Sequence, residues 1–276
     1  MTCKENLTDE VMGWLGCVAA WILFLVPIQV MLKIKRRGAI EDFAATPYMV
    51  TAVQCGLWVV YAIVTPCKLQ PLVTNSVGAG LELVYIVFMV VYSGAARAKV
   101  ALQFAGYATL FVVLTVLGVA IAPHLPIDGF PVQDPKLSRQ TTILGFVCAG
   151  LNILMYASPL SIMRTVIRTK SVEYMPLPLT LAVGVCSCFW LIYAIASQPL
   201  DPFILIPNAA GVCLCVMQIL LYARYCGRTI KVNVEDPTSR LSHDSLEPPD
   251  DPGRSLISPI ASDAEAAKTT CGATLS

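Results

Sequence analysis

The chain has 276 residues, of which 56% are apolar and only 13% are charged, and its mean hydropathy is +0.69. A soluble globular domain typically has about 45–50% apolar and about 25% charged residues. The composition therefore indicates an integral membrane protein. The formal net charge of +1 excludes a strongly basic surface, so nucleic acid is not an expected partner.

A helix needs about 20 mostly apolar residues to cross a bilayer. Seven such segments follow one another along the chain, at 12–32, 44–64, 70–93, 101–122, 142–163, 177–197 and 202–225. They predict an all-α integral membrane fold with seven transmembrane helices. The first ten residues are polar and lack the basic stretch that opens a signal peptide, so we expect the first segment to be retained.

Lys and Arg gather in alternate flanks of these segments, twelve in one set of flanks and four in the other. Short cytosolic loops carry the excess of positive charge in membrane proteins. We therefore expect the amino terminus outside the cell and the carboxyl terminus in the cytosol. The plasma membrane is the expected location, with the vacuolar or another endomembrane as the alternative.

The first three helices and the last three repeat one another, because matched residues recur at spacings that agree to within one residue. The matched pairs are Pro27 and Pro159, Trp58 and Trp190, Tyr61 and Tyr193, and Asn75 and Asn208. Such an internal repeat defines the architecture. A three-helix unit that starts outside ends inside, so one linking helix must return the chain. The prediction is 3+1+3, two parallel triple-helix bundles joined by a linker helix.

This architecture divides the chain into six parts, and the last of them is rich in Asp, Glu, Ser, Thr and Pro, a composition typical of disorder. The linker helix lacks the Trp, Asn and Pro signals and is not expected to take part in the chemistry. The parts are an extracellular amino-terminal tail (1–11), a first three-helix repeat (12–95), linker helix 4 (96–124), an extracellular loop (125–141), a second three-helix repeat (142–226) and a disordered cytosolic tail (227–276).

Two tryptophans and two asparagines in the repeats are the candidate substrate-binding residues. An indole offers a flat π face to the C–H side of a sugar ring, and an amide offers one donor and one acceptor group to neighbouring hydroxyls. Trp58, Asn75, Trp190 and Asn208 could together hold a neutral polyol. The alternatives are interface anchoring by the tryptophans and helix pairing by the asparagines. Recurrence in both halves favours the binding site.

One face of the fifth helix carries Asn152 and Met155, and Ala20 and Leu23 occupy the equivalent face of the first helix. The long apolar side chains of Leu23 and Met155 would narrow a cavity between these helices, and Asn152 adds an amide. A single hexose should then fit better than sucrose. The alternative is that Met155 only fills a gap between helices.

Four prolines, two in each repeat, fall near the predicted cytosolic ends of helices and remove backbone donors there. Spanning helices tolerate proline, so a harmless kink is the alternative to a hinge. These candidate gating residues are Pro27, Pro47, Pro159 and Pro176.

Glu82 lies deep within the third segment, where an ionisable group suggests a function such as proton coupling. The matching position of the second repeat is Cys215, so no chain of acids is present there. We therefore expect a structural, hydrogen-bonded Glu82 and transport driven only by the gradient of the substrate.

The eleven cysteines show no metal-ligand spacing, and most of them lie in apolar runs. We expect small hydrophobic residues with no disulfide role, and neither a metal nor a cofactor. The two histidines, His124 and His243, fall in a loop and in the tail, so the clustered acid and base groups of an enzyme are not indicated.

Several longer motifs occur in a characteristic order. They run from Ile34 to Phe43, Pro47 to Tyr48, Trp58 to Asn75, Asn152 to Leu160, Thr169 to Pro176 and Asp201 to Asn208. On these motifs the chain, over about 12–226, resembles the SWEET family of sugar transporters. Parallel repeats are typical of that family. Gln54 and Cys186 depart from it, since they stand where small polar residues are common in the substrate site.

The resemblance implies a facilitative, bidirectional uniporter that moves monosaccharides such as glucose by alternating access. It also implies that the four prolines serve an inner gate and that Tyr61, Tyr193 and Asp201 serve an outer gate, with Tyr193 and Asp201 as a hydrogen-bonded pair. Asp201 could instead cap the last helix. Family members that carry disaccharides tend to have smaller residues at the positions of Asn152 and Met155.

Two alternative functions are kept. One is a related PQ-loop carrier, coupled to protons, of another small neutral or zwitterionic metabolite, and the other is transport of sucrose in place of hexose. The expected partners are a small-molecule sugar and membrane lipid, and homo-oligomerisation is left open.

Overall fold

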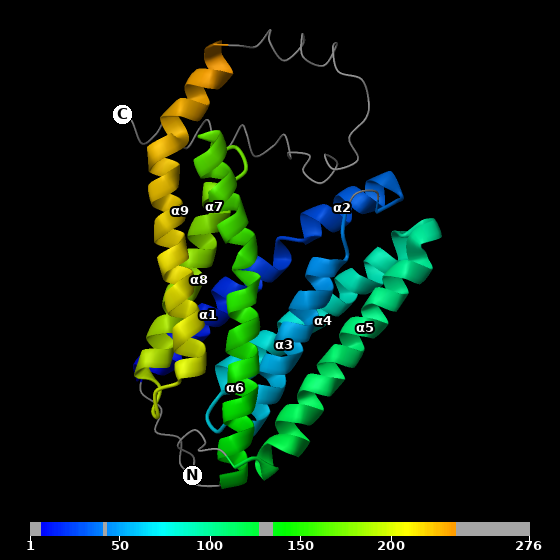
Figure 1. Cartoon of the computed structure of the whole chain (residues 1–276), viewed down its shortest axis with the longest axis vertical. Coiled ribbons are helices and arrows are strands. Elements are labelled where there is room, and N and C mark those ends of the chain that lie inside the picture. The colour runs from blue at the N-terminus through cyan, green and yellow to red at the C-terminus, as the bar shows by residue number, and fades with distance from the viewer. Residues whose placement is uncertain (1–6, 41–42, 127–134, 236–276) are drawn as a thin grey trace. The chain divides into compact units, whose positions relative to one another are not determined.

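The structure is a computed structural model that describes residues 7–40, 43–126 and 135–235 (Figure 1). Within those ranges all regular structure is helical, and seven stretches are long and apolar enough to cross a membrane. This confirms the predicted all-α fold with seven spans. The spans are Leu7–Arg37, Thr46–Val64, Leu69–Tyr92, Gly94–His124, Leu137–Thr169, Leu177–Ala196 and Pro202–Cys226.

Nine α-helices build these spans, because the first and fifth spans are each broken into two helices in the described part of the chain. The fourth span ends in a π-helical turn (Leu117–Ile121) and a short 3-10 turn (Ala122–His124). The helices are α1 (Leu7–Leu25), α2 (Ile28–Arg37), α3 (Thr46–Val64), α4 (Leu69–Tyr92), α5 (Arg97–Val116), α6 (Pro135–Met155), α7 (Ala157–Thr169), α8 (Leu177–Ala196) and α9 (Pro202–Glu235).

The chain forms two compact units. Unit 1 consists of Met1–Met155 and Val185–Ala210, and unit 2 consists of Tyr156–Gly184 and Gly211–Ser276. Unit 1 therefore contains α1 to α6 together with the end of α8 and the start of α9. It joins residues of both sequence repeats in one packed body.

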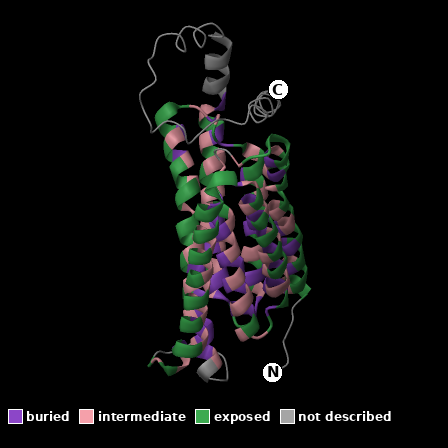
Figure 2. Cartoon of the chain, turned by 90° about the vertical axis from the view of Figure 1, so that its right-hand side faces the viewer, coloured by how far each residue is buried: buried purple, intermediate pink, exposed green. Residues whose placement is uncertain are grey.

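Helix α3 is the central helix of unit 1 and packs against α4, α5 and α6. Its buried residues recur every three or four positions, as a helix face requires, with Val53, Leu57 and Tyr61 among them. They pack with Leu144 of α6 and with Phe203 of α9 in one apolar cluster. Exposed residues cover the outward sides of the helices in Figure 2, as expected for helices surrounded by lipid.

Unit 2 has a smaller apolar cluster of its own, in which Val166 of α7 and Met175 of the α7–α8 connection pack against Tyr222 of α9. The Cys215 thiol of α9 also donates to the Thr180 carbonyl of α8 across 3.5 Å.

Helix α6 begins at Pro135, well before the span predicted from 142 and inside the predicted loop 125–141. Polar side chains of this extension bond to protein groups. Arg139 donates to the Pro123 carbonyl and Gln140 to the Val119 carbonyl. These bonds satisfy the side chains of Arg139 and Gln140 where the helix continues past its apolar stretch.

The tails also differ from the predicted boundaries. Helix α1 begins at Leu7, inside the predicted tail 1–11, and α9 continues to Glu235, inside the predicted tail 227–276. Residues 1–6, 127–134 and 236–276 lie outside the described residues, so the predicted disorder of the carboxyl-terminal tail is not assessed there.

The prediction for the cysteines holds in the apolar runs and fails outside them. Among the described residues, seven cysteines form no disulfide, namely Cys17, Cys55, Cys148, Cys186, Cys188, Cys213 and Cys215. Cys67 and Cys226 are disulfide-bonded instead. Cys67 lies in the α3–α4 connection and Cys226 at the end of the last span, where the apolar-run argument does not apply.

Candidate functional site

A cavity of about 250 Å³ lies inside unit 1. Residues of both repeats line it, whereas the linker helix α5 contributes none of the described lining residues. The lining consists of Ala20, Phe24, Thr51, Gln54, Cys55, Trp58, Pro71, Thr74, Asn75, Asn152, Met155, Trp190, Ile204 and Asn208. Sequence reasoning placed seven of these residues in the binding site.

The two predicted tryptophans line the cavity, and each packs edge-to-face on the tyrosine three residues later. The ring centroids are 5.2 Å apart for Trp58 and Tyr61, and 5.4 Å apart for Trp190 and Tyr193. The interplanar angles are 81° and 82°. Such edge-to-face pairs are favourable beyond the area they bury. The sequence repeat is thus also a repeat of local geometry.

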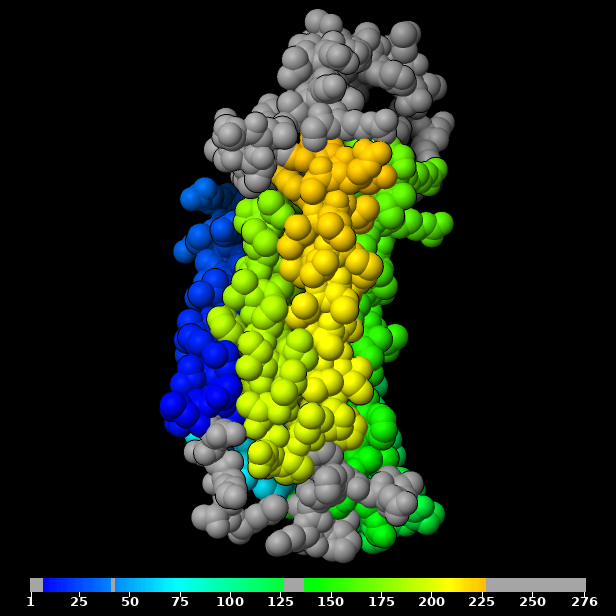
Figure 3. All heavy atoms as spheres, turned by 90° about the vertical axis from the view of Figure 1, so that its left-hand side faces the viewer, coloured from blue at the N-terminus to red at the C-terminus, as the bar shows by residue number. Residues whose placement is uncertain are grey.

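A glycine makes room for the second tryptophan. A Cβ on Gly16 of α1 would lie 3.0 Å from the Trp190 ring, so the bare backbone allows the indole to approach. Figure 3 shows α1 (blue) running beside the last turns of α8 (yellow-green), which carry Trp190. The close contact fixes the plane of the indole at the cavity wall.

The two predicted asparagines also line the cavity, and the same bond holds both of them. Asn75 Nδ2 donates to the Pro71 carbonyl at 2.9 Å, and Asn208 Nδ2 donates to the Ile204 carbonyl at 2.7 Å. Each amide is therefore oriented by the carbonyl four residues earlier in its own helix. Each retains a carbonyl oxygen and a second N–H, which suit neighbouring hydroxyl groups of a solute.

Gln54 connects the two repeats at the cavity wall. Its Nε2 donates to Asn152 Oδ1 at 2.8 Å and to the Cys148 carbonyl at 3.0 Å. Its Oε1 is buried and has no hydrogen-bond partner. Thr74, also in the lining, is buried and has its hydroxyl beside the Cys17 thiol. The wall therefore offers further polar atoms that a bound solute could satisfy.

Two residues expected in the substrate site are not among those that line this cavity. Leu23 is replaced by Phe24, whose ring rests on α4 where a Cβ on Gly78 would come within 2.6 Å. The cavity face of α1 thus carries Ala20 and Phe24, a spacing of i, i+4. Cys186 is buried with its Sγ 4.0 Å from the Gly16 carbonyl oxygen, facing α1.

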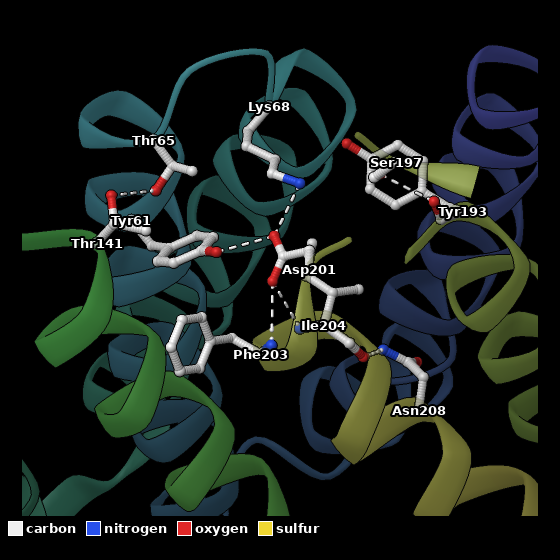
Figure 4. Close-up of polar contacts among 10 residues, drawn as sticks. All are labelled: Tyr61, Thr65, Lys68, Thr141, Tyr193, Ser197, Asp201, Phe203, Ile204 and Asn208. Atoms are coloured by element: carbon white, nitrogen blue, oxygen red, sulfur yellow. Dashed lines mark hydrogen bonds and ion pairs between the residues drawn. The ribbon is translucent and has the colours of Figure 1, made fainter. Parts of the chain in front are cut away.

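Asp201 is fully buried at the start of α9, where its two carboxylate oxygens have different partners (Figure 4). Oδ1 accepts hydrogen bonds from the backbone N–H groups of Phe203 at 3.0 Å and Ile204 at 3.2 Å. This confirms the capping alternative. Oδ2 lies 2.8 Å from both Tyr61 Oη, which donates to it, and Lys68 Nζ.

The expected pair of Tyr193 and Asp201 is therefore wrong, because Tyr61 of the first repeat makes this bond. Tyr193 instead places its ring 5.5 Å from the Lys68 ammonium, in a cation–π arrangement. Sequence analysis counted Lys68 only as one of the four Lys and Arg residues in the less basic set of flanks. The available signal was its position directly before an apolar helix, where a charged side chain needs a partner once it is buried.

We call Tyr61, Lys68 and Asp201 the Asp201 cluster. It joins the end of α3 and the start of α4, both in the first repeat, to the start of α9 in the second repeat. A hydroxyl contact between Thr65 and Thr141, at 3.1 Å, makes a further link from α3 to α6 nearby. The Trp58–Tyr61 contact connects the cluster to the cavity wall. The cluster thus joins the ends of three helices of unit 1 where α3 finishes.

All four predicted gating prolines lie at helix starts, where a missing N–H costs little. In unit 1, Pro27 separates α1 from α2 and Pro47 lies in the first turn of α3. In unit 2, Pro159 lies in the first turn of α7, and Pro176 accepts the Thr180 N–H at the start of α8.

Glu82 is 3% exposed, and its Oε2 has no hydrogen-bond partner. The expected hydrogen-bonded carboxylate is therefore wrong for this oxygen. Glu82 does not line the cavity. Among the described residues no group of three or more His, Cys, Asp or Glu could hold a metal ion.

A family model described as "Sugar efflux transporter for intercellular exchange" matches the chain twice, at residues 10–97 and 142–229. The double match confirms the internal duplication read from the sequence.

Curated relatives are named bidirectional sugar transporters. SWEET7 of Arabidopsis thaliana is 32% identical over 233 residues, which cover 83% of this chain and 85% of the relative. SWEET1b of Oryza sativa subsp. indica is 39% identical over 223 residues, which cover 80% of each chain. A solved structure of a eukaryotic SWEET transporter superposes with a TM-score of 0.69 at 29% identity, covering 80% of this chain and 98% of that one.

Proposed function

The chain belongs to the SWEET family of sugar transporters, and we propose that it is a facilitative, bidirectional carrier of monosaccharides such as glucose. The observation that carries this proposal is the cavity in unit 1, with one tryptophan and one asparagine from each repeat in its wall. These residues supply ring faces and paired amides, which are the groups that a neutral polyol needs.

Two features of the cavity favour a small neutral solute. Its volume of about 250 Å³ is below the roughly 300–1,000 Å³ usual for sites that hold drug-sized ligands. None of the described lining residues carries a charge. The first feature favours a hexose over sucrose, and the second disfavours a zwitterion, whose charged groups would need charged or strongly polar partners once desolvated.

Alternating access requires that the cavity opens to one side at a time. We propose that the Asp201 cluster closes one end of the cavity and that the breaks at Pro27 and before Pro159 act as hinges; the buried ion pair and the helix ends at these positions support this. We infer from the distribution of Lys and Arg that the Asp201 cluster faces the outside and that the prolines serve the cytosolic side. The proposed location is the plasma membrane.

Uptake by cells that lack their own hexose carriers tests the proposal. Cells that express the chain should take up radiolabelled glucose well above the background of empty-vector cells. They should take up little cystine, lysine or sucrose. Uptake of cystine or lysine in place of glucose would favour the related amino-acid carriers, for which the buried Glu82 Oε2 without a hydrogen-bond partner is the supporting observation.

A further inference from the structure

The break in the first span leaves the Phe24 carbonyl group of α1 without its helical donor. Helix α1 ends at Leu25, and the N–H of Val26 turns back to Leu23. In a continuous helix the Phe24 carbonyl would accept from Ile28, but Ile28 is the first residue of α2. Inside a membrane each such group must be satisfied by the protein.

A side chain of α4 supplies the missing donor. Tyr85 Oη donates to the Phe24 carbonyl oxygen at 2.9 Å. The tyrosine is 4% exposed and packs edge-to-face on Tyr48, with 5.9 Å between ring centroids. Phe24 is also a cavity residue whose ring rests on Gly78. One hydroxyl group outside the cavity wall thus supports both the kink and a lining side chain.

The same helix carries an acceptor that has no donor in this conformation. Glu82 precedes Tyr85 by three residues, so the two side chains share a face of α4. Helical side chains lean toward the amino terminus, which directs Tyr85 over the turn that contains Glu82. The buried Oε2 of Glu82 lacks a hydrogen bond. A buried oxygen left this way needs an explanation.

We propose that Tyr85 is a positioning residue whose hydroxyl alternates between the Phe24 carbonyl and the Glu82 carboxyl group as the first span bends and straightens. The proposal rests on the proposed function, because it describes a step of alternating access. When the span straightens, the Ile28 N–H takes over the Phe24 carbonyl. Tyr85 is then free to donate to Glu82. In the straightened span the Phe24 carbonyl and the Glu82 carboxyl group therefore each have a donor.

The pair of Glu82 and Tyr85 has no equivalent in the second repeat. Cys215 and Gln218 follow Asn208 at the spacings at which Glu82 and Tyr85 follow Asn75. The second repeat therefore has neither the hydroxyl nor the acid. The proposal therefore gives Glu82 a role that needs no equivalent acid in the second repeat. It also does not require Glu82 to carry a proton across the membrane.

Initial rates of glucose uptake by the full-length protein, measured over a concentration series and divided by the amount at the cell surface, test this proposal. Tyr85→Phe should lower the maximal rate by about 2- to 12-fold, the effect of one net hydrogen bond. The half-saturating glucose concentration should stay within about twofold, because the hydroxyl does not line the cavity. A loss of packing alone would lower the amount at the surface and leave the rate per molecule unchanged.

Variants of Glu82 identify the second acceptor. Glu82→Gln keeps an acceptor oxygen and should retain the wild-type rate, whereas Glu82→Met should lower the maximal rate as Tyr85→Phe does. In the double variant Tyr85→Phe/Glu82→Met, the Met substitution should have no further effect. Tyr48→Phe is the matched control, because it removes a hydroxyl from the ring next to Tyr85, and it should behave as wild type.

The outcomes separate cleanly. Rate losses that multiply in the double variant, a change only in the half-saturating concentration, or coupling of Glu82 to Tyr48 in place of Tyr85 would each overturn this proposal while the wild type still transports glucose. A wild type at the surface that carries no sugar would contradict the proposed function itself, and the role of Tyr85 in transport with it.

Discussion

Lys68 and Asp201 come from different sequence repeats, and their Nζ and Oδ2 atoms lie 2.8 Å apart with both side chains almost fully buried. Desolvation of two charges is costly, and their attraction offsets it only when the remaining hydrogen bonds are made. Here Tyr61 and two backbone N–H groups complete the coordination of the carboxylate. The pair therefore stabilises the contact between the two repeats in this conformation.

Removing one partner of this pair should destabilise the protein. Lys68→Met leaves Asp201 buried without its cation, at a cost of about 3–5 kcal/mol in the free energy of unfolding. The melting temperature of the detergent-purified protein should fall clearly. Lys170→Met is the matched control, since Lys170 is exposed and contacts only the Tyr225 ring and hydroxyl. The double variant Lys68→Met/Asp201→Asn should recover part of the loss, and equal melting temperatures for all variants would contradict a buried pair.

The two asparagines of the cavity should both be required for uptake. Asn75→Ala or Asn208→Ala would leave sugar hydroxyls desolvated and unpaired, at about 1–3 kcal/mol, or roughly 5- to 150-fold in affinity. Uptake at low glucose should collapse while the amount at the cell surface persists. Ser76→Ala is the control, because its side chain makes the same backbone bond, to Leu72 at 2.7 Å, on an exposed face. Normal uptake by either asparagine variant would remove that residue from the site.

Substrate size should depend on the α6 side of the cavity. Asn152→Ser with Met155→Val shortens two lining side chains and also removes the amide oxygen that accepts from Gln54. The double variant should admit sucrose and transport hexose less well. The ratio of radiolabelled sucrose to glucose uptake measures this change. An unchanged ratio, or a wild type that carries both sugars, would show that these residues do not set the size limit.

The duplicated residues could be predicted from the sequence because each half supports the other. Trp58 and Trp190, and likewise Asn75 and Asn208, recur at matched spacing, and all four line one cavity. Their common local bonds, to the tyrosine three residues later or to the carbonyl four residues earlier, follow from helix geometry. A single sequence gives the spacing of residues within one helix, so contacts between residues three or four positions apart can be predicted from it.

Contacts between the repeats could not be predicted in the same way. The symmetric tyrosines Tyr61 and Tyr193 are equivalent by pattern, and only the packing of α3 against α9 decides which one reaches Asp201. The break at Pro27 ends α1 just after Phe24, and the face of α1 on the cavity carries Phe24 in place of Leu23. The pattern of apolar residues along a helix does not distinguish which of two adjacent residues, here Leu23 or Phe24, faces the cavity.

Energy coupling is the property that most directly distinguishes this account from its alternatives. Purified protein in glucose-free liposomes should take up radiolabelled glucose until the internal and external concentrations are equal, and then stop. Efflux from preloaded liposomes should run as readily as uptake, an imposed proton gradient should change neither rate, and Glu82→Gln should behave like the wild type. Accumulation of glucose above the external concentration, driven by the proton gradient and abolished by Glu82→Gln, would contradict a facilitative carrier.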